Sequence, residues 1–272
     1  MKKLFFSSLF AFSILLSVSA PAFAVKPAGG GGSPTVKQST LGNDISFPQC
    51  GSRLPSGQAF GIVGVNGGLA NTNNPCFAEQ LAWAQNSNGS TSQPNAALYV
   101  NTANPTKAAA SKWPKDNNVN GTEISSPYGT CADTDGVACS YIYGYTRAFE
   151  DATMRNVPSP STFKWWLDVE TGNSWSTTDL AANAASLEGM VDYFKSIKVT
   201  GLGIYSTSYQ WNTIVGKLSD SSALNGLESW LAGSRTERSA KTACADAPLT
   251  LNGTVTVTQF VSKGLDYDVS CR

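Results

Sequence analysis

The sequence contains no histidine, and this absence excludes several kinds of chemistry. Ser-His-Asp and Cys-His catalytic groups need an imidazole as their base, and many zinc sites use histidine nitrogen as a ligand. An enzyme built from this chain must therefore work with carboxylates, tyrosine, lysine or an unassisted nucleophile. Carboxylates are the first groups to consider, and we expect neither a metal site nor a cofactor.

The chain is also poor in charge, with 14% charged residues and 19 basic against 19 acidic side chains. This balance, without any long run of basic residues, argues against a nucleic-acid partner and against a polybasic membrane anchor. Ser, Thr, Asn and Gly are abundant instead. Such a composition is typical of an exported protein that binds a neutral, polar ligand.

The N-terminus has the pattern of a secretory signal peptide. Two lysines at positions 2–3 precede an apolar run over residues 4–18, and Ala-Phe-Ala at 22–24 fits a signal-peptidase site. The apolar run is too short, and too often interrupted by serine, for a good membrane span. We therefore predict a signal peptide over residues 1–24 and a secreted, extracellular protein without a membrane span after its removal.

A flexible leader rich in Gly, Pro and Ser is expected over residues 25–40. The remaining residues, 41–272, contain no internal repeat and no second linker. Their length suits one large domain, such as an α/β barrel, or two small ones. We predict a single barrel domain over 41–272, acting as a monomer.

The sequence contains six cysteines, all of which follow the predicted signal peptide. An even number in an exported chain predicts three disulfides, for which about 15 connectivities exist. We favour sequential pairing, because each bond then closes a local loop and the last one holds the C-terminus: Cys50 with Cys76, Cys131 with Cys139, and Cys244 with Cys271. A metal site is the alternative, but the cysteines have no C-x-x-C spacing and no histidine to assist them.

Short apolar runs alternate with helical stretches, which is typical of a parallel α/β architecture. We expect strands at 42–46, 60–65, 96–101, 163–169, 201–205, 228–232, 254–260 and 265–269. We expect helices at 75–86, 106–112, 140–156 and 179–197, the last capped by Thr178 or Asp179. The count predicts a (β/α)8 TIM-type barrel with disulfide-stapled loops and an irregular segment between the sixth and seventh strands. The long loop 113–139 is expected to build part of an active-site wall.

The strongest chemical signal is the segment Trp-Trp-Leu-Asp-Val-Glu at residues 165–170. Side chains alternate along a strand, so Asp168 and Glu170 point to the same side while Val169 points away. Two carboxylates on an otherwise apolar strand are costly unless they are used or satisfied. Each charge changes the proton affinity of the other, so one carboxyl can stay protonated while the other ionises. Glycoside hydrolysis needs that division of roles.

Two further acids are expected near the same place. Asp44 ends the first predicted strand, and Asp266 lies close to the last one. If the strands close into a barrel, all four carboxylates gather at its C-terminal mouth. The alternatives are an Asx turn for Asp44 and a surface acid for Asp266.

Other polar side chains carry weaker signals. Arg147 lies near Glu150 and Asp151, and this arrangement is most simply a surface ion pair that contributes little stability. Glycosylation sequons begin at Asn88, Asn120 and Asn252, but in a chain so rich in Asn and Ser they carry little information.

Six short motifs occur in order over residues 42–270: D-I-S-x-x-Q, I-V-G-V-N-G-G, W-L-D-V-E, G-I-Y-S-T, S-W-L-A, and T-Q-F followed by L-D-Y-D. This ordered set resembles family 25 of the glycoside hydrolases, the Ch-type lysozymes or muramidases. Those enzymes carry D-V-S-x-x-Q, D-x-E, I-Y-T-S, L-W-x-A, W-Q-Y and V-D-x-N in the same order. Each motif is weak alone, but six in register are hard to obtain by chance.

The resemblance implies a (β/α)8-type barrel that cleaves the β-1,4 bond between N-acetylmuramic acid and N-acetylglucosamine in peptidoglycan. It implies Glu170 as general acid and Asp168 as the group that positions the acetamido substituent or stabilises the oxocarbenium-like centre. Asp44 and Asp266 are implied as supporting acids. Candidates for substrate binding are Gln49, Asn66, Asn101, Tyr205, Trp230 and Gln259, the two glutamines contacting either the sugar or the catalytic acids. Trp230, Trp166 and Tyr99 are candidates for stacking on sugar faces, with barrel packing the expected role of Trp166.

The sequence departs from the family at the substrate-facing end. Thr258 stands where the family has the Trp of W-Q-Y, and Val-Asn-Gly-Gly at 65–68 replaces K-A-T-E-G. These changes favour an alternative, a catalytically inactive carbohydrate-binding or cell-envelope protein on the same barrel. The retained carboxyls argue against it, because buried acids without a task are costly.

Overall fold

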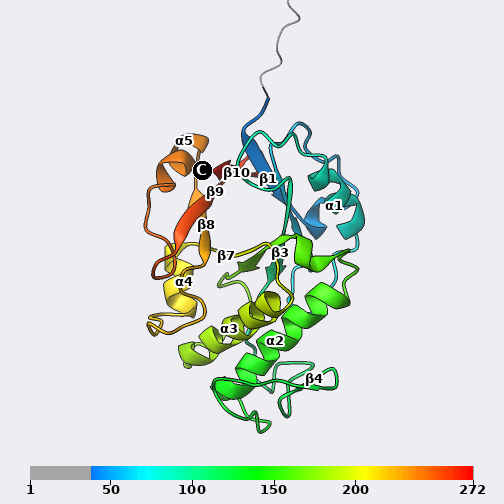
Figure 1. Ribbon diagram of the computed structural model, residues 1–272. Coiled ribbons are helices and arrows are strands. Elements are labelled where there is room, and N and C mark those ends of the chain that lie inside the picture. Colours follow the sequence, from blue (N-terminus) through cyan, green and yellow to red (C-terminus); the bar gives the residue numbers. More distant parts are fainter. Residues whose placement is uncertain (1–37, 272) are drawn as a thin grey trace, which may run out of the picture. The chain divides into compact units, whose positions relative to one another are not determined.

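The computed structural model describes residues 38–271 (Figure 1). The predicted signal peptide 1–24 and most of the predicted leader 25–40 lie outside the described residues. Residues 38–40 are exposed and belong to no helix or strand, and the first strand begins at Leu41. No helix among residues 38–271 is both long and apolar enough to cross a membrane.

Eight strands close into a barrel, as predicted from the alternating pattern. In their order around the barrel they are β1 (Leu41–Ile45), β2 (Gly61–Gly64), β3 (Ala96–Asn101), β6 (Lys164–Asp168), β7 (Gly201–Ser206), β8 (Glu228–Ser234), β9 (Thr254–Ser262) and β10 (Leu265–Ser270). All neighbours from β1 to β9 run parallel. The fold is therefore a mixed α/β barrel of the (β/α)8-like type.

The last strand makes the barrel irregular, because β10 runs antiparallel to both of its neighbours. Only Lys263 and Gly264 connect β9 to β10, and both have positive φ angles, of 52° and 75°. Positive φ at both central residues is typical of a type I′ hairpin turn, and so short a turn can join only antiparallel strands. The segment between β8 and β9, predicted to be irregular, contains one short helix. The pairing of β8 with β9 also has register shifts.

The helices are α1 (Phe77–Gln85), α2 (Val137–Thr153), α3 (Leu180–Ser196), α4 (Ser208–Ile214) and α5 (Glu237–Ala243). Two short 3-10 turns, Phe47–Gln49 and Pro160–Thr162, and a hairpin of β4 (Asn118–Val119) with β5 (Thr122–Glu123) complete the fold. Asp179 caps α3, since its carboxyl accepts a hydrogen bond from Ala182 N at 2.9 Å. The helices α4 and α5 and the strands β4 and β5 were not predicted, because each is too short to show a clear period.

The helix predicted at 106–112 is wrong, because these residues form turns and bends. The segment lies between Pro105 and Pro114, and so short a helix without a packed apolar face is marginal in water. By contrast, α2 and α3 pack closely side by side (Figure 1). Gly144 and Gly189 allow this approach, since a Cβ atom on either would overlap backbone of the facing helix.

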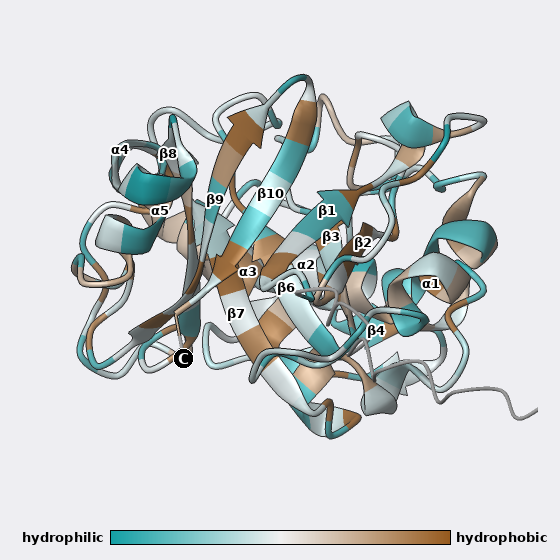
Figure 2. Cartoon of the chain, turned by 90° about the horizontal axis from the view of Figure 1, so that it is seen from above, coloured by the Kyte–Doolittle hydropathy of each residue, from teal (hydrophilic) through white to brown (hydrophobic). Residues whose placement is uncertain are grey.

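Alternation along β6 separates two apolar regions. Trp166 points into the barrel, where it packs with Phe60, Ile62 and Trp230. Trp165 points outward and contacts Phe194 of α3, with ring centroids 4.6 Å apart. Figure 2 shows hydrophobic stretches along the strands and hydrophilic ones on the outer helix α1.

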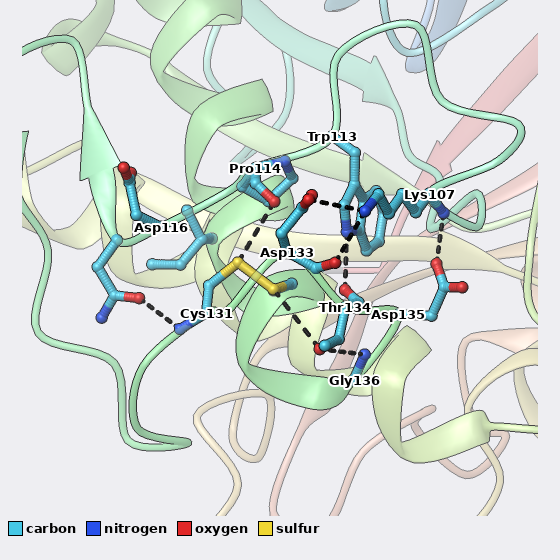
Figure 3. Close-up of a disulfide and its surroundings, with 12 residues drawn as sticks. Lys107, Trp113, Pro114, Asp116, Cys131, Asp133, Thr134, Asp135 and Gly136 are labelled. Atoms are coloured by element: carbon cyan, nitrogen blue, oxygen red, sulfur yellow. Dashed lines mark hydrogen bonds and ion pairs between the residues drawn. A yellow bond between two sulfur atoms is a disulfide. The ribbon is translucent and has the colours of Figure 1, made fainter.

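All three predicted disulfides are present with the sequential pairing: Cys50–Cys76, Cys131–Cys139 and Cys244–Cys271. Cys131–Cys139 ties the long loop to the start of α2 (Figure 3). Nearby, Trp113 Nε1 donates to Thr134 O at 2.8 Å and Lys107 pairs with Asp133 at 2.7 Å. The loop therefore has a fixed internal framework.

The position of loop 113–139 differs from the prediction that it builds an active-site wall. Its apolar residues, including Val119 and Ile124, pack on Tyr141 and Ile142 of α2, and the hydroxyl of Tyr128 donates to Glu188 of α3. None of its residues is among those that line the acidic cavity described below. The loop instead covers the outer surfaces of α2 and α3, where its apolar side chains find partners.

Candidate active site

A cavity of about 260 Å³ lies at the carboxyl ends of the parallel strands. Its charged lining residues are all acidic: Asp44, Asp168, Glu170 and Asp266. Asp44, Asp168 and Glu170 lie at or just beyond the ends of β1 and β6. Asp266 lies near the start of β10, which reaches the same end of the barrel because that strand is antiparallel. We call this space the acidic cavity.

The barrel brings nine of the ten predicted catalytic and substrate-binding residues to this cavity. Besides the four acids, they are Gln49, Asn101, Tyr205, Trp230 and Gln259. The tenth, Asn66, does not line it and is only 1% exposed. Its Oδ1 accepts a hydrogen bond from Asn101 N at 2.7 Å, and its Nδ2 donates to Asp151 at 2.8 Å. Asn66 therefore holds the backbone of Asn101 in place. Its own polar atoms bond within the protein and are not free to bind a ligand.

Asp168 and Glu170 point to the cavity, and Val169 between them is fully buried in the core outside the barrel. Burial raises the pKa of Asp168 well above its ordinary value, and the nearby charges of Glu170 and Asp44 raise it further. Asp168 Oδ1 is buried without a hydrogen-bond partner among residues 38–271. A neutral Asp168 is therefore available to bond to a polar group of a ligand.

Glu170 is less buried than Asp168, and a tight turn holds its backbone. Its carbonyl oxygen accepts hydrogen bonds from Asn173 N at 3.1 Å and from Trp175 Nε1 at 2.9 Å. The main chain at Glu170 is thus anchored from two sides, while its carboxyl group lines the cavity.

On the opposite wall, a chain of hydrogen bonds orients Asp44. Tyr205 donates from its hydroxyl to Gln259 Oε1 at 2.9 Å, and Gln259 Nε2 donates to Asp44 Oδ2 at 2.9 Å. Burial raises the pKa of Asp44 to about 8, and the charge of Asp266 acts in the same direction. Burial also raises the pKa of Asp266. The site therefore retains protons on carboxyl groups at neutral pH.

Asp268 was not predicted as a site residue, and it is fully buried. It accepts a hydrogen bond from Trp230 Nε1 at 2.9 Å, and its other oxygen, Oδ2, is buried without a hydrogen-bond partner among residues 38–271. Burial raises the pKa of Asp268 well above its ordinary value, and the charges of Asp44 and Asp266 add to this. Asp266 and Asp268 alternate with Tyr267, so the rule that identified Asp168 and Glu170 would also have identified this pair.

Aromatic side chains supply the rest of the site. Trp166 is fully buried and packs inside the barrel, while Trp230 and Tyr99 line the cavity. Phe47, which sequence analysis did not single out, lines the cavity and is 41% exposed. An exposed ring at the mouth suits contact with the apolar face of a sugar. Within residues 38–271, no cluster of three or more His, Cys, Asp or Glu side chains has a metal-binding arrangement.

Arg147 was predicted to form a surface ion pair, but it is buried, with only 2% of its surface exposed. It bonds to Glu150 at 3.0 Å, and the neighbouring Arg155 bonds to Asp151, which is fully buried, at 2.5 Å. The packing of α2 against residues 69–74 encloses this cluster: Arg155 donates to the carbonyl oxygens of Ala70 and Thr72. These ion pairs are internal.

A comparison with protein families matches residues 132–240 to the family described as Lysozyme-like protein 1. This range includes Asp168, Glu170, Tyr205 and Trp230. No curated protein sequence matches the chain.

Among solved structures, a muramidase from Trichobolus zukalii is 18% identical, with a TM-score of 0.50 over 85% of this chain and 93% of that one. A family 25 glycosyl hydrolase of Streptococcus pneumoniae is 17% identical, with a TM-score of 0.48 over 86% of this chain and 87% of that one. A bacterial lysozyme from Streptomyces coelicolor is 15% identical, with a TM-score of 0.47 over 86% and 93%.

The family match and the likeness to the Trichobolus muramidase agree with the resemblance found in the sequence motifs. The chain has the fold of a lysozyme-like glycoside hydrolase.

Proposed function

We propose that this protein is a secreted glycoside hydrolase that cleaves a cell-envelope glycan, with peptidoglycan as the first candidate. The observation that carries the proposal is the gathering of four carboxyl side chains in one cavity at the carboxyl ends of the barrel strands. Enzymes on such barrels carry their catalytic groups at this end. Cleavage of a glycosidic bond needs carboxyl groups with different protonation states.

In this proposal Glu170 is the general acid that protonates the leaving oxygen. It is the more accessible member of the Asp168–Glu170 pair, and its backbone is anchored by the turn that follows. Asp168, kept neutral by burial, donates a hydrogen bond to a polar substituent of the sugar, such as an acetamido oxygen. Of the remaining carboxyls, Asp44 keeps its proton at neutral pH, and Asp266 in its ionised form stabilises the positive charge that develops on the sugar ring. A water molecule attacks the anomeric carbon as the glycosidic bond breaks, and its proton passes to a carboxylate of the site.

The proposed substrate contacts follow from the lining of the cavity. Gln49 and Asn101 offer amide groups, and Phe47 and Tyr99 offer aromatic surface. The amide group of Gln259 is already hydrogen-bonded to Asp44 and Tyr205, so its proposed role is to orient Asp44. Export fits the three disulfides, which persist in oxidising compartments. We propose that the mature protein acts as a monomer.

The test is to incubate the mature protein, and its Glu170→Gln variant, with peptidoglycan and a panel of envelope polysaccharides. New reducing ends are then identified by mass spectrometry. We expect wild type to release fragments, and Glu170→Gln to be slower by about 10²- to 10⁴-fold, because it lacks the proton that a general acid supplies. The matched control is Glu79→Gln on the exposed face of α1, which we expect to retain full activity.

The alternative, a glycan-binding protein without catalysis, predicts a different result. Wild type would then sediment with one polymer and release no fragments from any of them. Equal release by wild type and Glu170→Gln would contradict the assignment of the general acid.

A further inference from the structure

A second cavity, of about 190 Å³, lies beside the acidic cavity. Two stretches of chain line both: Gly68 lines the acidic cavity and Leu69 the second, and Asn101 lines the acidic cavity and Thr102 the second. Consecutive Cα atoms are only about 3.8 Å apart, so these segments form a shared wall. A ligand in the acidic cavity is therefore close enough to extend a substituent into the second.

The second cavity has the opposite charge. Its only charged lining residues are Lys112 and Arg147. We call it the basic cavity. Apolar side chains, including Leu69, Ala103, Pro105 and Ala109, form much of its wall. This lining suits a short, partly apolar group that carries a negative charge.

Arg147 is held in place before any ligand binds. Its Nη2 donates to Glu150 Oε1 at 3.0 Å, and its guanidinium lies 5.2 Å from the centre of the Tyr143 ring. Trp113 stacks on the same Tyr143 ring, with centroids 5.2 Å apart. A guanidinium fixed in this way loses little conformational entropy when it binds a carboxylate with its planar donors.

Two buried donors in the lining residues have no partner among residues 38–271. They are Arg147 Nε and Asn173 Nδ2. Buried polar groups are satisfied in most proteins, so two unsatisfied N–H donors beside one cavity need an explanation. Both atoms have almost no accessible surface, so an anion in the cavity would accept from them only after a small movement of the lining side chains.

The cluster behind the cavity also carries one more cation than anion. Lys112, Arg147 and Arg155 are paired with only two carboxylates, Glu150 and Asp151. The third cation, Lys112, is 73% exposed, so solvent screens its charge and the buried charges are balanced. An anion entering from the open side of the cavity would gain Lys112 and Arg147 as partners.

From these observations we infer that the basic cavity binds a carboxylate carried by the glycan that occupies the acidic cavity. Arg147 and Asn173 would donate hydrogen bonds to this carboxylate, and Lys112 at the open side would add attraction. On peptidoglycan such a group is either the lactyl carboxylate of a muramic acid residue or a carboxylate of an attached peptide. The inference rests on the proposed function for the glycan, but it concerns binding and does not need cleavage.

The test measures binding to the mature chain carrying Glu170→Gln, so that the ligand stays intact. The main probe is a peptide-free tetrasaccharide of alternating N-acetylglucosamine and N-acetylmuramic acid with free lactyl carboxylates. The matched probe is the same glycan with these carboxyls converted to methylamides. Calorimetry should show the free acid binding about 10- to 100-fold more tightly, the usual value of a charged hydrogen bond.

Two substitutions added to this background remove the preference in different ways. Arg147→Gln deletes the cation, and Asn173→Asp places a competing carboxylate at the cavity. Each should lower the affinity for the free acid to that for the methylamide, and leave the methylamide affinity unchanged. The control is Arg53→Gln, an exposed arginine outside both cavities. If Arg147→Gln fails to fold in thermal unfolding, Asn173→Asp alone decides the question.

A probe with peptides linked to the lactyl groups separates the two sources of the carboxylate. Tight binding of this probe would show that a peptide carboxylate occupies the basic cavity. Binding as weak as that of the methylamide would show that the lactyl carboxylate occupies it. Equal affinity for the free acid and the methylamide, or no binding of the free acid, would overturn the inference. Stronger competition by inorganic phosphate than by acetate would overturn the choice of a carboxylate.

Failure of the proposed function gives a different pattern. If wild type cleaves no glycan but still prefers the free acid through Arg147, the carboxylate site is supported and the proposed hydrolase activity is contradicted. If wild type cleaves peptidoglycan with no such preference, the hydrolase activity is supported and the carboxylate site is contradicted.

Discussion

The acidic and basic cavities lie side by side, but they handle buried charge in different ways. In the acidic cavity, burial raises the pKa values of Asp44, Asp168 and Asp266, so that the carboxyl groups keep protons. Behind the basic cavity, Arg147 and Arg155 are buried beside carboxylates and form ion pairs. At neutral pH the acids of the first site keep protons. The cluster of the second site is ionised, since burial raises the pKa of Asp151 only to about 6.

This difference has a physical basis. A carboxyl group can escape the cost of burial by taking up a proton, and a cluster of acids favours that route. An arginine stays protonated in proteins, so its burial requires a counterion or several hydrogen bonds. A protonated carboxyl suits proton transfer to a substrate, and a buried guanidinium suits recognition of a negative group.

The largest expected effect on stability concerns the ionised cluster. Arg155→Met would leave Asp151, which is fully buried, without its partner cation. We expect a loss of about 3–5 kcal/mol in the free energy of unfolding, measured by urea denaturation. Arg238→Met, on the exposed face of α5, is the control and should change little. A variant as stable as wild type would show that Asp151 simply takes up a proton, and the contrast between the cavities would fail.

A smaller effect is expected in the acidic cavity from Tyr205→Phe. The change removes the hydroxyl that donates to Gln259 Oε1 and leaves this oxygen without its donor. We expect a loss of about 1–3 kcal/mol in stability. Activity should also fall, because Gln259 no longer presents a fixed amide to Asp44. Unfolding and turnover are compared with Tyr209→Phe, whose ring is 78% exposed. Unchanged activity in Tyr205→Phe would contradict the positioning role of Gln259.

The stability of the folded chain is expected to depend on pH, because Asp268 and the neighbouring acids keep protons. Asp44, Asp168, Asp266 and Asp268 have higher pKa values in the folded chain than in the unfolded chain. The folded state then binds more protons, so stability falls as pH rises from about 4 upward, through about 8 for Asp44. We expect the melting temperature to decrease across this range.

Asp268→Asn tests this prediction, because an amide reproduces the contacts of a protonated acid. Its oxygen accepts from Trp230, as the carboxyl group does, and its NH2 group takes the place of the buried Oδ2 without adding charge. At neutral pH we expect stability within about 1 kcal/mol of wild type, and a smaller loss on raising the pH. The exposed Asp220→Asn should follow the wild-type pH profile. A large loss at neutral pH would mean that Asp268 is ionised.

The smallest effect is expected at the open edge of the basic cluster. Lys112 lies 3.7 Å from Glu150, and its side chain is 73% exposed. Solvent screens such a pair, so Lys112→Ala should change the free energy of unfolding by less than about 0.5 kcal/mol. The same urea titration measures it. A loss comparable to that of Arg155→Met would show that the cluster depends on its exposed edge.

Much of the acidic site was predictable because its rules are local. Alternation along a strand places Asp168 and Glu170 together, and it places Trp166 inside the barrel and Trp165 outside. The same rule applied to Asp266 would have identified Asp268. Local loop closure was also enough to pair the cysteines correctly.

The basic cavity was not predictable in this way. Arg147 appears in the sequence beside Glu150, and nothing local distinguishes a surface ion pair from a buried one. Its burial arises from contacts of α2 with residues 69–74 and with the segment 102–112, which was wrongly predicted to contain a helix. Asn66 was misplaced for the same reason, since its partner Asp151 is 85 residues away.

The sequence by itself determined the eight barrel strands, the disulfide pairs and the face on which each strand acid lies, because these depend on alternation and short loops. Only the tertiary structure decided which charges are buried and which cavity each faces. The cost of a buried charge depends on every segment packed around it, and here those segments come from distant parts of the chain.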